Sequence, residues 1–279
     1  MQTTIEYAPQ PQLTEEAPEG KAENLDLTYR SGEDTEDTDI ESGIQQVMEV
    51  LDIEMDNKQK KRILNFLRKC DEVDRHYSAK LQAHHSLLAD LLLVFWAHFF
   101  NRALITVGIL LSAGVGFFRY NEMLSNLGYQ PVQGDLSIEE RIRYGVVFML
   151  FYGFSLLAMV SSTQVLKYTI RRPRPAYRPE VTRYGCQLRK FENGTFSMPS
   201  GDAAVAGVFC YVYAFVAGLP AVYVILPLVC GGRVYYQCHF IGDTIFGSLV
   251  GTFWGALMSA FVVIFVPLFR LIMDSPESF

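Results

Sequence analysis

Residues 144–166 read YGVVFMLFYGFSLLAMVSSTQVL and contain no charged side chain. A helix needs about 20 mainly apolar residues to cross the hydrocarbon core of a bilayer, and this stretch is long enough. It therefore predicts a transmembrane helix. Just before it, Ser137 and Glu140 have the spacing of a capping box, which predicts that the helix opens there.

Further apolar segments flank this stretch. They predict helices at about 86–100, 103–118, 199–217, 219–231 and 240–269. Together these segments indicate an all-α fold, a polytopic transmembrane helix bundle of about six helices. The stretch 86–118 also fits one long tilted helix, an alternative that would reverse the side of the membrane on which the N-terminus lies.

Small residues recur every four positions in the last of these segments, at Gly247, Gly251, Gly255 and Ser259. This spacing forms a small-xxx-small face, which lets two helices approach closely. We expect the face to pack against another helix, and it also allows a homo-oligomer to form through Gly247, Gly251 and Gly255.

The N-terminal region differs from the rest in composition. Residues 1–43 hold twelve acidic and two basic side chains, so the remaining residues carry about +4 of the formal net charge of −6. We expect 1–43 to be a disordered acidic tail, 44–85 an amphipathic helical segment in the cytosol and 86–279 the transmembrane domain. The basic cluster 58–62 also fits a segment that lies on an anionic leaflet.

Polar residues gather at the ends of three apolar segments. The groups are KYTIRRPRP at 167–175, SMPSGD at 197–202 and RVYYQCHFIGD at 233–243. Each alone has an ordinary explanation, since cations beside a membrane often set topology and Pro-Ser-Gly is a common start of a helix. A single histidine at a membrane edge is likewise more often a packed or interfacial residue.

Together the groups carry the chemistry of a phosphate site. The prolines of the first group stiffen the backbone that carries its arginines. Ser200 and Gly201 offer a hydroxyl and backbone N–H groups at a helix N-terminus, where phosphate binds readily. His239 and Asp243 are four residues apart and share a helix face, so the carboxylate can accept one ring proton and leave the other nitrogen free to attack.

In this order, Lys-x6-Arg-Pro, Pro-Ser-Gly and Arg-x5-His-x3-Asp resemble the three-part signature of the type 2 phosphatidic acid phosphatase superfamily. The resemblance covers about residues 86–269. It implies a phosphoric ester or diphosphate hydrolase with His239 as the nucleophile and Asp243 as its orienting partner. It also implies a phosphate clamp and a hydrogen-bonding cradle formed by Lys167, Arg174, Arg233, Ser200 and Gly201.

Two positions depart from the family pattern. Asp202 stands where the family usually has a second histidine, the acid that protonates the leaving oxygen, and Gly232 stands where it usually has serine. An ordinary aspartate has a pKa of about 3.9 and is ionised at neutral pH. We therefore take Asp202 as the candidate acid, with catalytic impairment as the alternative.

The resemblance implies a lipid phosphate monoester, or an isoprenoid or lipid diphosphate, as the substrate. We expect no metal and no cofactor, because three fixed cations can neutralise the phosphoryl oxygens. The partners that we expect are the substrate and the bilayer, with no nucleic acid. The alternatives are a lipid phosphotransferase and an inactive lipid-binding scaffold. Vanadate-dependent haloperoxidases share the pocket but are soluble, and the spans argue against them.

The resemblance and the spans together indicate a multi-pass protein of the endoplasmic reticulum or plasma membrane. With six crossings, both termini lie in the cytosol and all three motifs face the lumen or the exterior. The sequon at Asn193 would then lie on the side where glycosylation occurs.

Overall fold

The computed structural model describes residues 56–83, 86–100, 102–132, 134–176 and 196–273. The predicted acidic tail and the sequon at Asn193 lie outside these residues. The described helices are α2 (Asn57–Ala83), α3 (Leu87–His98), α4 (Arg102–Phe118), α5 (Tyr120–Asn126), α6 (Ile138–Ile170), α7 (Gly201–Tyr211), α8 (Ile225–Tyr235) and α9 (Ile241–Met273). A π-helical segment, Val212–Val216, extends α7, and a 3-10 turn, Pro220–Val224, precedes α8.

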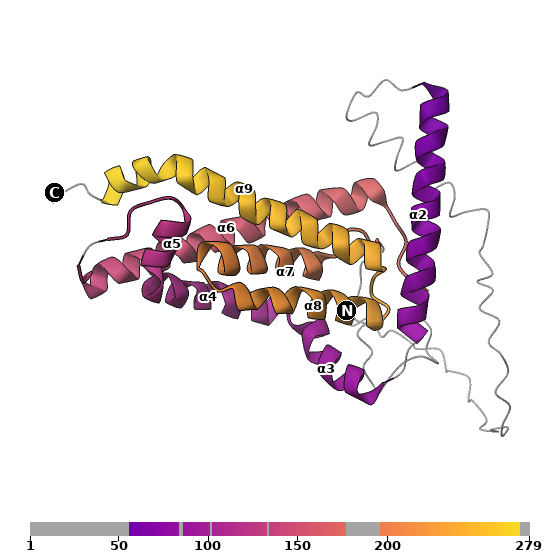
Figure 1. The fold of residues 1–279 in the computed structure, drawn as a ribbon, viewed down its shortest axis with the longest axis horizontal. Coiled ribbons are helices and arrows are strands. Elements are labelled where there is room, and N and C mark those ends of the chain that lie inside the picture. Colours follow the sequence, from indigo (N-terminus) through magenta and orange to yellow (C-terminus); the bar gives the residue numbers. More distant parts are fainter. Residues whose placement is uncertain (1–55, 84–85, 101, 133, 177–195, 274–279) are drawn as a thin grey trace, which may run out of the picture.

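The long helices form one bundle. Helices α4, α6, α7, α8 and α9 run side by side along the long axis, and α2 runs across one end of them (Figure 1). Every regular element in the described part of the chain is helical, so the predicted all-α fold is confirmed. Helices α3 and α4 are separate, as the prediction of two short helices at 86–100 and 103–118 requires.

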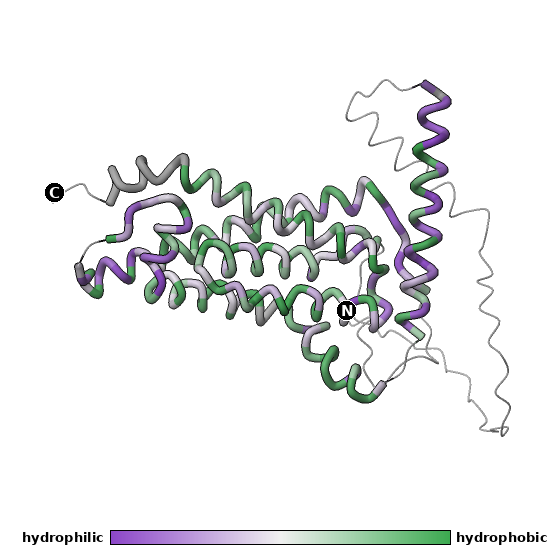
Figure 2. Tube along the Cα trace, viewed as in Figure 1, coloured by the Kyte–Doolittle hydropathy of each residue, from purple (hydrophilic) through white to green (hydrophobic). Residues whose placement is uncertain are grey.

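The helices of the bundle consist mainly of hydrophobic residues (Figure 2). Helix α6 and the segment Ile241–Val263 of α9 are long and apolar enough to cross a membrane. Both also present large apolar side chains outward: Phe154 and Leu157 of α6 are 60% and 62% exposed, and Leu249 of α9 is 61% exposed. An apolar surface of this extent is typical of a protein surrounded by lipid.

Helix α6 begins at the predicted capping box. The Ser137 hydroxyl accepts a hydrogen bond from the Glu140 backbone N–H (3.3 Å), and the Glu140 carboxylate accepts one from the Ser137 N–H (2.8 Å). The helix ends at Arg171, which adopts the left-handed conformation with φ 53°. These two ends hold the chain so that the first polar group emerges at the end of the bundle where α2 lies.

The small-residue face of α9 is occupied within the chain. A Cβ atom added at Gly247 would collide with the backbone of Ser200, and one added at Gly251 would collide with the backbone of Ala204 in α7. Gly255 faces the ring of Tyr211 at the other end of α7. The prediction of close helix packing is correct, with α7 as the partner within the chain. A homo-oligomer through Gly247, Gly251 and Gly255 stays a prediction.

We expect Gly251→Val to destabilise the protein, since the added carbons must push α9 away from α7. Overpacking of this kind costs about 1–3 kcal/mol of unfolding free energy. Thermal unfolding of the purified protein measures the loss. Gly153→Val in α6 is the matched control, because nothing lies within 4 Å of a Cβ at that glycine. Equal melting temperatures for the two variants would contradict the close packing.

Helix α3 lies across the end of α8 and does not run along the bundle. The Tyr236 hydroxyl donates to the Asp90 carbonyl (3.2 Å), the Tyr235 hydroxyl to the Ser86 carbonyl (3.4 Å) and Arg233 Nη1 to the Ala97 carbonyl (3.2 Å). With 12 residues, α3 is about 18 Å long, well short of a bilayer core of about 30 Å. The chain is therefore still at this end of the bundle when α4 begins.

This arrangement disagrees with the predicted topology. Six crossings would place residues 44–85 and the polar motifs on opposite sides of the membrane. In the structure α2 contacts the segment around His239 directly, so α2 and the motifs share one side. Helix α9 then runs to the opposite end of the bundle (Figure 1).

In sealed vesicles we expect α2 and the C-terminal end of α9 to lie on opposite sides. A membrane-impermeant thiol reagent can report α2 through the exposed Cys70, and protease access to a C-terminal tag reports α9. Vesicles in which the reagent reaches Cys70 should protect the tag. A Cys70→Ser variant and detergent-opened vesicles are the controls, and equal access to both markers would restore the six-crossing topology.

Candidate active site

The three polar groups converge at the end of the bundle beside α2. The first follows the C-terminus of α6, Ser200 is the N-cap of α7, and the segment with His239 joins α8 to α9. A β-bridge between Pro173 and Phe196 holds the chain on both sides of residues 177–195 together at this point. The folded bundle thus gathers residues that are far apart in the sequence.

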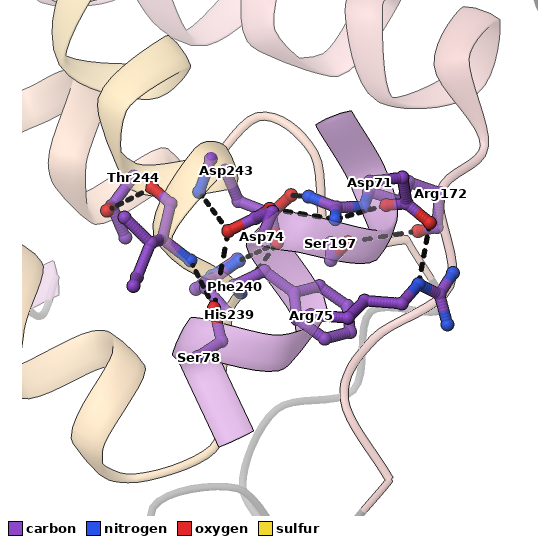
Figure 3. A network of polar contacts seen from close by, with 12 residues as sticks. Asp71, Asp74, Arg75, Ser78, Arg172, Ser197, His239, Phe240, Asp243 and Thr244 are labelled. Atoms are coloured by element: carbon purple, nitrogen blue, oxygen red, sulfur yellow. Dashed lines mark hydrogen bonds and ion pairs between the residues drawn. The ribbon is translucent and has the colours of Figure 1, made fainter. Parts of the chain in front are cut away.

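Arg172 lies at the centre of the polar network drawn in Figure 3. Its Nη1 donates to Asp243 Oδ1 (2.6 Å), and its Nη2 contacts the carboxylates of Asp71 and of Asp74, the latter at 2.8 Å. The guanidinium also lies over the ring of Phe240, 4.4 Å from its centroid. Burial alone would lower the pKa of Arg172, but the carboxylates of Asp243, Asp71 and Asp74 together raise it.

His239 is buried beside Asp243. Its Nδ1 lies 3.7 Å from Asp243 Oδ2, on the side that leaves Nε2 for other partners. Asp243 itself is fully buried, and its Oδ2 accepts the Phe240 N–H (2.9 Å). Burial lowers the pKa of His239, and the positive charge of Arg233 acts in the same direction. These two effects favour the neutral imidazole.

Ser200, the N-cap of α7, lies beside Asp243. Its backbone N–H donates to the Asp243 carbonyl (3.0 Å), and its buried hydroxyl has no hydrogen-bond partner within the described residues. A Cβ at Gly201 would have no atom of the described residues within 4 Å. A hydroxyl without a partner and open space at a helix N-terminus fit the predicted phosphate cradle.

Arg174 and Arg233 both lie near His239. Arg174 Nη1 donates to the Cys238 carbonyl, next to His239, at 3.1 Å. Arg233 is buried, and its Nη2 forms an ion pair with Asp202 Oδ2 at 2.9 Å. The positive charges of both guanidinium groups act to lower the pKa of His239. Lys167 is half-buried in the last turn of α6.

Sequence reasoning missed three contributions to this site. Arg172 was not distinguished from its neighbouring arginines, and the acidic residues of α2 were not connected with the motifs. Asp71, Asp74 and Ser78 recur at three and four residues, which was the available signal for one polar helix face. The third is His98 of α3, whose ring is influenced by the charges of both Arg233 and Asp202.

Helix α2 also closes the N-terminus of α9. The Gly242 N–H donates to Asp74 Oδ1 (2.9 Å) and the Ile241 N–H donates to the Ser78 hydroxyl (2.9 Å). These bonds satisfy backbone groups that a helix start leaves unpaired. Asp71, Asp74 and Asp243 meet around a guanidinium, and the described residues contain no cluster of His, Cys, Asp and Glu arranged to hold a metal ion.

Comparison with known proteins agrees with the sequence pattern. Residues 148–266 match the family model of the PAP2 superfamily, which confirms the predicted resemblance over that part of the chain. No curated protein matches the chain significantly. A solved structure that is similar is "the first transmembrane PAP2 type phosphatidylglycerolphosphate phosphatase from Bacillus subtilis", at 20% identity and a TM-score of 0.45, covering 79% of this chain and 95% of that one.

We expect Arg172→Gln to impair the site, because it removes the cation that faces the buried Asp243. A displacement of about 1 Å at a reacting group can cost about 10²-fold in rate. We therefore expect a loss of about that size in kcat/KM, measured on purified protein with a synthetic lipid phosphate. Arg171→Gln is the matched control, since Arg171 is exposed and, among the described residues, its Nε donates to the Tyr168 carbonyl in its own helix end. Similar losses in both variants would contradict a positioning role.

Proposed function

We propose that the chain, whose residues 148–266 carry the PAP2 family pattern, is an integral membrane phosphatase that hydrolyses a lipid phosphate monoester or diphosphate through a phosphohistidine on His239. The observation that carries the proposal is the buried His239–Asp243 pair beside Arg174, Arg233 and the Ser200 hydroxyl. The match to the family model supports a lipid phosphatase at the level of the family.

In the proposed reaction His239 Nε2 attacks phosphorus in line with the lipid oxygen. The bond from phosphorus to nitrogen forms as the bond from phosphorus to the lipid oxygen breaks, and the departing oxygen takes a proton. Arg174, Arg233 and Lys167 neutralise the equatorial oxygens, and Ser200 with the first N–H groups of α7 orients them. Water then attacks the phosphohistidine, which releases phosphate and restores the imidazole.

Two alternatives remain testable with the same protein. A lipid phosphotransferase would pass the phosphoryl group to an alcohol, because water and an alcohol are interchangeable acceptors for a phosphoenzyme. An inactive lipid-binding scaffold would bind the substrate without turnover, a reading that rests on Asp202. Phosphate release with and without an added lipid alcohol separates the three.

His239→Ala should abolish turnover and any acid-labile phosphoenzyme, because it removes the attacking nitrogen. Phosphate release and trapping of labelled phosphoenzyme measure the two effects. Asp243→Asn should cost less, since it disturbs the orientation of the ring but leaves the nucleophile in place. A His239→Ala variant that releases phosphate at the rate of the unmodified protein would show that the nucleophile is another residue.

The pH dependence follows from the same pair. Protonation of His239 removes the attacking lone pair, and burial lowers its pKa. The acidic limb of kcat/KM should therefore lie below the ordinary histidine pKa of about 6.5. A limb at or above that value would contradict the buried neutral imidazole.

If Asp202 is the acid, its protonated form is needed and the rate should fall toward alkaline pH. Asp202→His restores the usual family residue and should move the optimum toward neutrality. Asp202→Asn removes the proton and should slow substrates with poor leaving groups most. A lipid diphosphate needs less help from an acid, because its leaving group, the lipid monophosphate, is already a good anion. We therefore propose diphosphates or other activated esters as the preferred substrates.

Rates for a poor and a good leaving group, across pH, test this role. Equal loss in Asp202→Asn for both groups, with an unchanged pH profile, would leave Asp202 as a partner of Arg233 at the start of α7. His98, which is influenced by the same two charges, would then be the next candidate donor. His98→Gln tested on the same pair of substrates would decide between them.

A further inference from the structure

Helix α2 has a fixed rotation about its own axis. Asp71, Asp74, Ser78 and Gln82 face the bundle, where they contact Arg172, Gly242, Ile241 and His239. The remaining surface of α2 contacts no other described helix along most of its length, and the N-terminal half extends past the bundle (Figure 1). The proposed reaction assigns no role to that surface.

Apolar side chains form a stripe on this surface. Its members are Ile63, Phe66, Val73, Tyr77 and Leu81, with exposures of 39%, 65%, 56%, 58% and 38%. They follow one another at three or four residues, apart from a gap filled by Cys70, so they lie on one side of the helix. The stripe runs next to the face that contacts the bundle and is separate from it.

The same helix begins with a strong positive charge. Between 56 and 70 the chain has six basic residues and one acidic residue, Asp56. The basic residues are Lys58, Lys60, Lys61, Arg62, Arg68 and Lys69. Figure 2 shows hydrophilic and hydrophobic residues interspersed along α2, in contrast with the mainly hydrophobic bundle beside it.

We propose that this stripe and the basic turns of α2 dock on the anionic leaflet of the membrane that the bundle crosses. Helix α2 runs across the end of the bundle, so it lies along the membrane surface when the bundle stands upright in the bilayer (Figure 1). An amphipathic helix with Lys and Arg beside its apolar face binds at the boundary of headgroups and acyl chains. A second copy of the chain is the less suitable occupant, because two such basic segments repel each other.

Docking of α2 would bring the candidate active site close to the anionic headgroups of the same leaflet. The carboxylates of Asp71 and Asp74 hold Arg172 from the same helix that contacts the leaflet. A helix held on the membrane by the stripe presents these carboxylates at a constant height above the bundle. The leaflet that α2 binds is therefore the one whose lipids reach His239.

Cys70 provides a direct probe, because it is exposed and lies within the stripe. The full chain carries an environment-sensitive fluorophore on Cys70 in vesicles whose lipids bear a shallow nitroxide quencher. Labelled Cys70→Ser protein gives the background from other thiols. Quenching should rise at least about twofold when roughly 30 mol% of neutral lipid is replaced by anionic lipid, and salt should reverse the rise.

The variant Lys58→Gln/Lys60→Gln/Lys61→Gln/Arg62→Gln should lose this rise while melting at the same temperature. Arg141→Gln/Arg143→Gln is the matched control, since both residues lie at the opposite end of the bundle, and it should keep the rise. Equal quenching in neutral and anionic vesicles would overturn the proposal. Label-to-label energy transfer that disappears with one chain per nanodisc would overturn it in favour of a second copy on the stripe.

Phosphate release is a separate measurement on the same samples. Loss of quenching in the four-residue variant with His239-dependent activity intact would support docking independently of the reaction. Docking without any activity would remove the proposed function and leave the surface assignment standing.

Discussion

The site depends on the buried contact between Arg172 and Asp243. This guanidinium joins three parts of the chain: the segment after α6, the first turn of α9 and, through Asp71 and Asp74, helix α2. One guanidinium carries too little charge to neutralise three carboxylates, so each carboxylate needs a further donor. The Phe240 N–H donates to Asp243 and the Gly242 N–H donates to Asp74. Arg75 forms an ion pair with Asp71 (2.6 Å). Both backbone donors belong to the start of α9, where negative charge is favourable.

Because α7 packs tightly on α9, the phosphate cradle at the start of α7 has a fixed position relative to Asp243. Gly247 allows the backbone of Ser200 to approach α9, and the Ser200 N–H then reaches the Asp243 carbonyl at 3.0 Å. The residue that orients His239 and the N-cap that offers a hydroxyl are therefore held by one helix pair. A larger residue at Gly247 or Gly251 would separate the two and widen the site.

The sequence predicted the parts of the site whose chemistry restricts the residue type. Cations, a helix N-terminus and a His–Asp pair are required by phosphoryl transfer, and they stand out among apolar segments. The individual arginines were not separable, because Arg171 and Arg172 are identical side chains in adjacent positions. The left-handed conformation of Arg171 turns the chain so that Arg171 is exposed and Arg172 is buried, and no composition rule predicts that turn. The spacing of Gly247, Gly251 and Gly255 predicted close packing but could not name α7 as the partner.

Asp202 places a carboxylate in the site where the family pattern usually has a histidine. Without substrate its carboxylate accepts from Arg233 and occupies one of the cations that phosphate needs. In the proposed reaction a phosphate dianion competes for that guanidinium and brings a like charge beside the carboxylate. We infer that substrate binding itself would break the ion pair between Asp202 and Arg233 and free the carboxyl for the acid role proposed above.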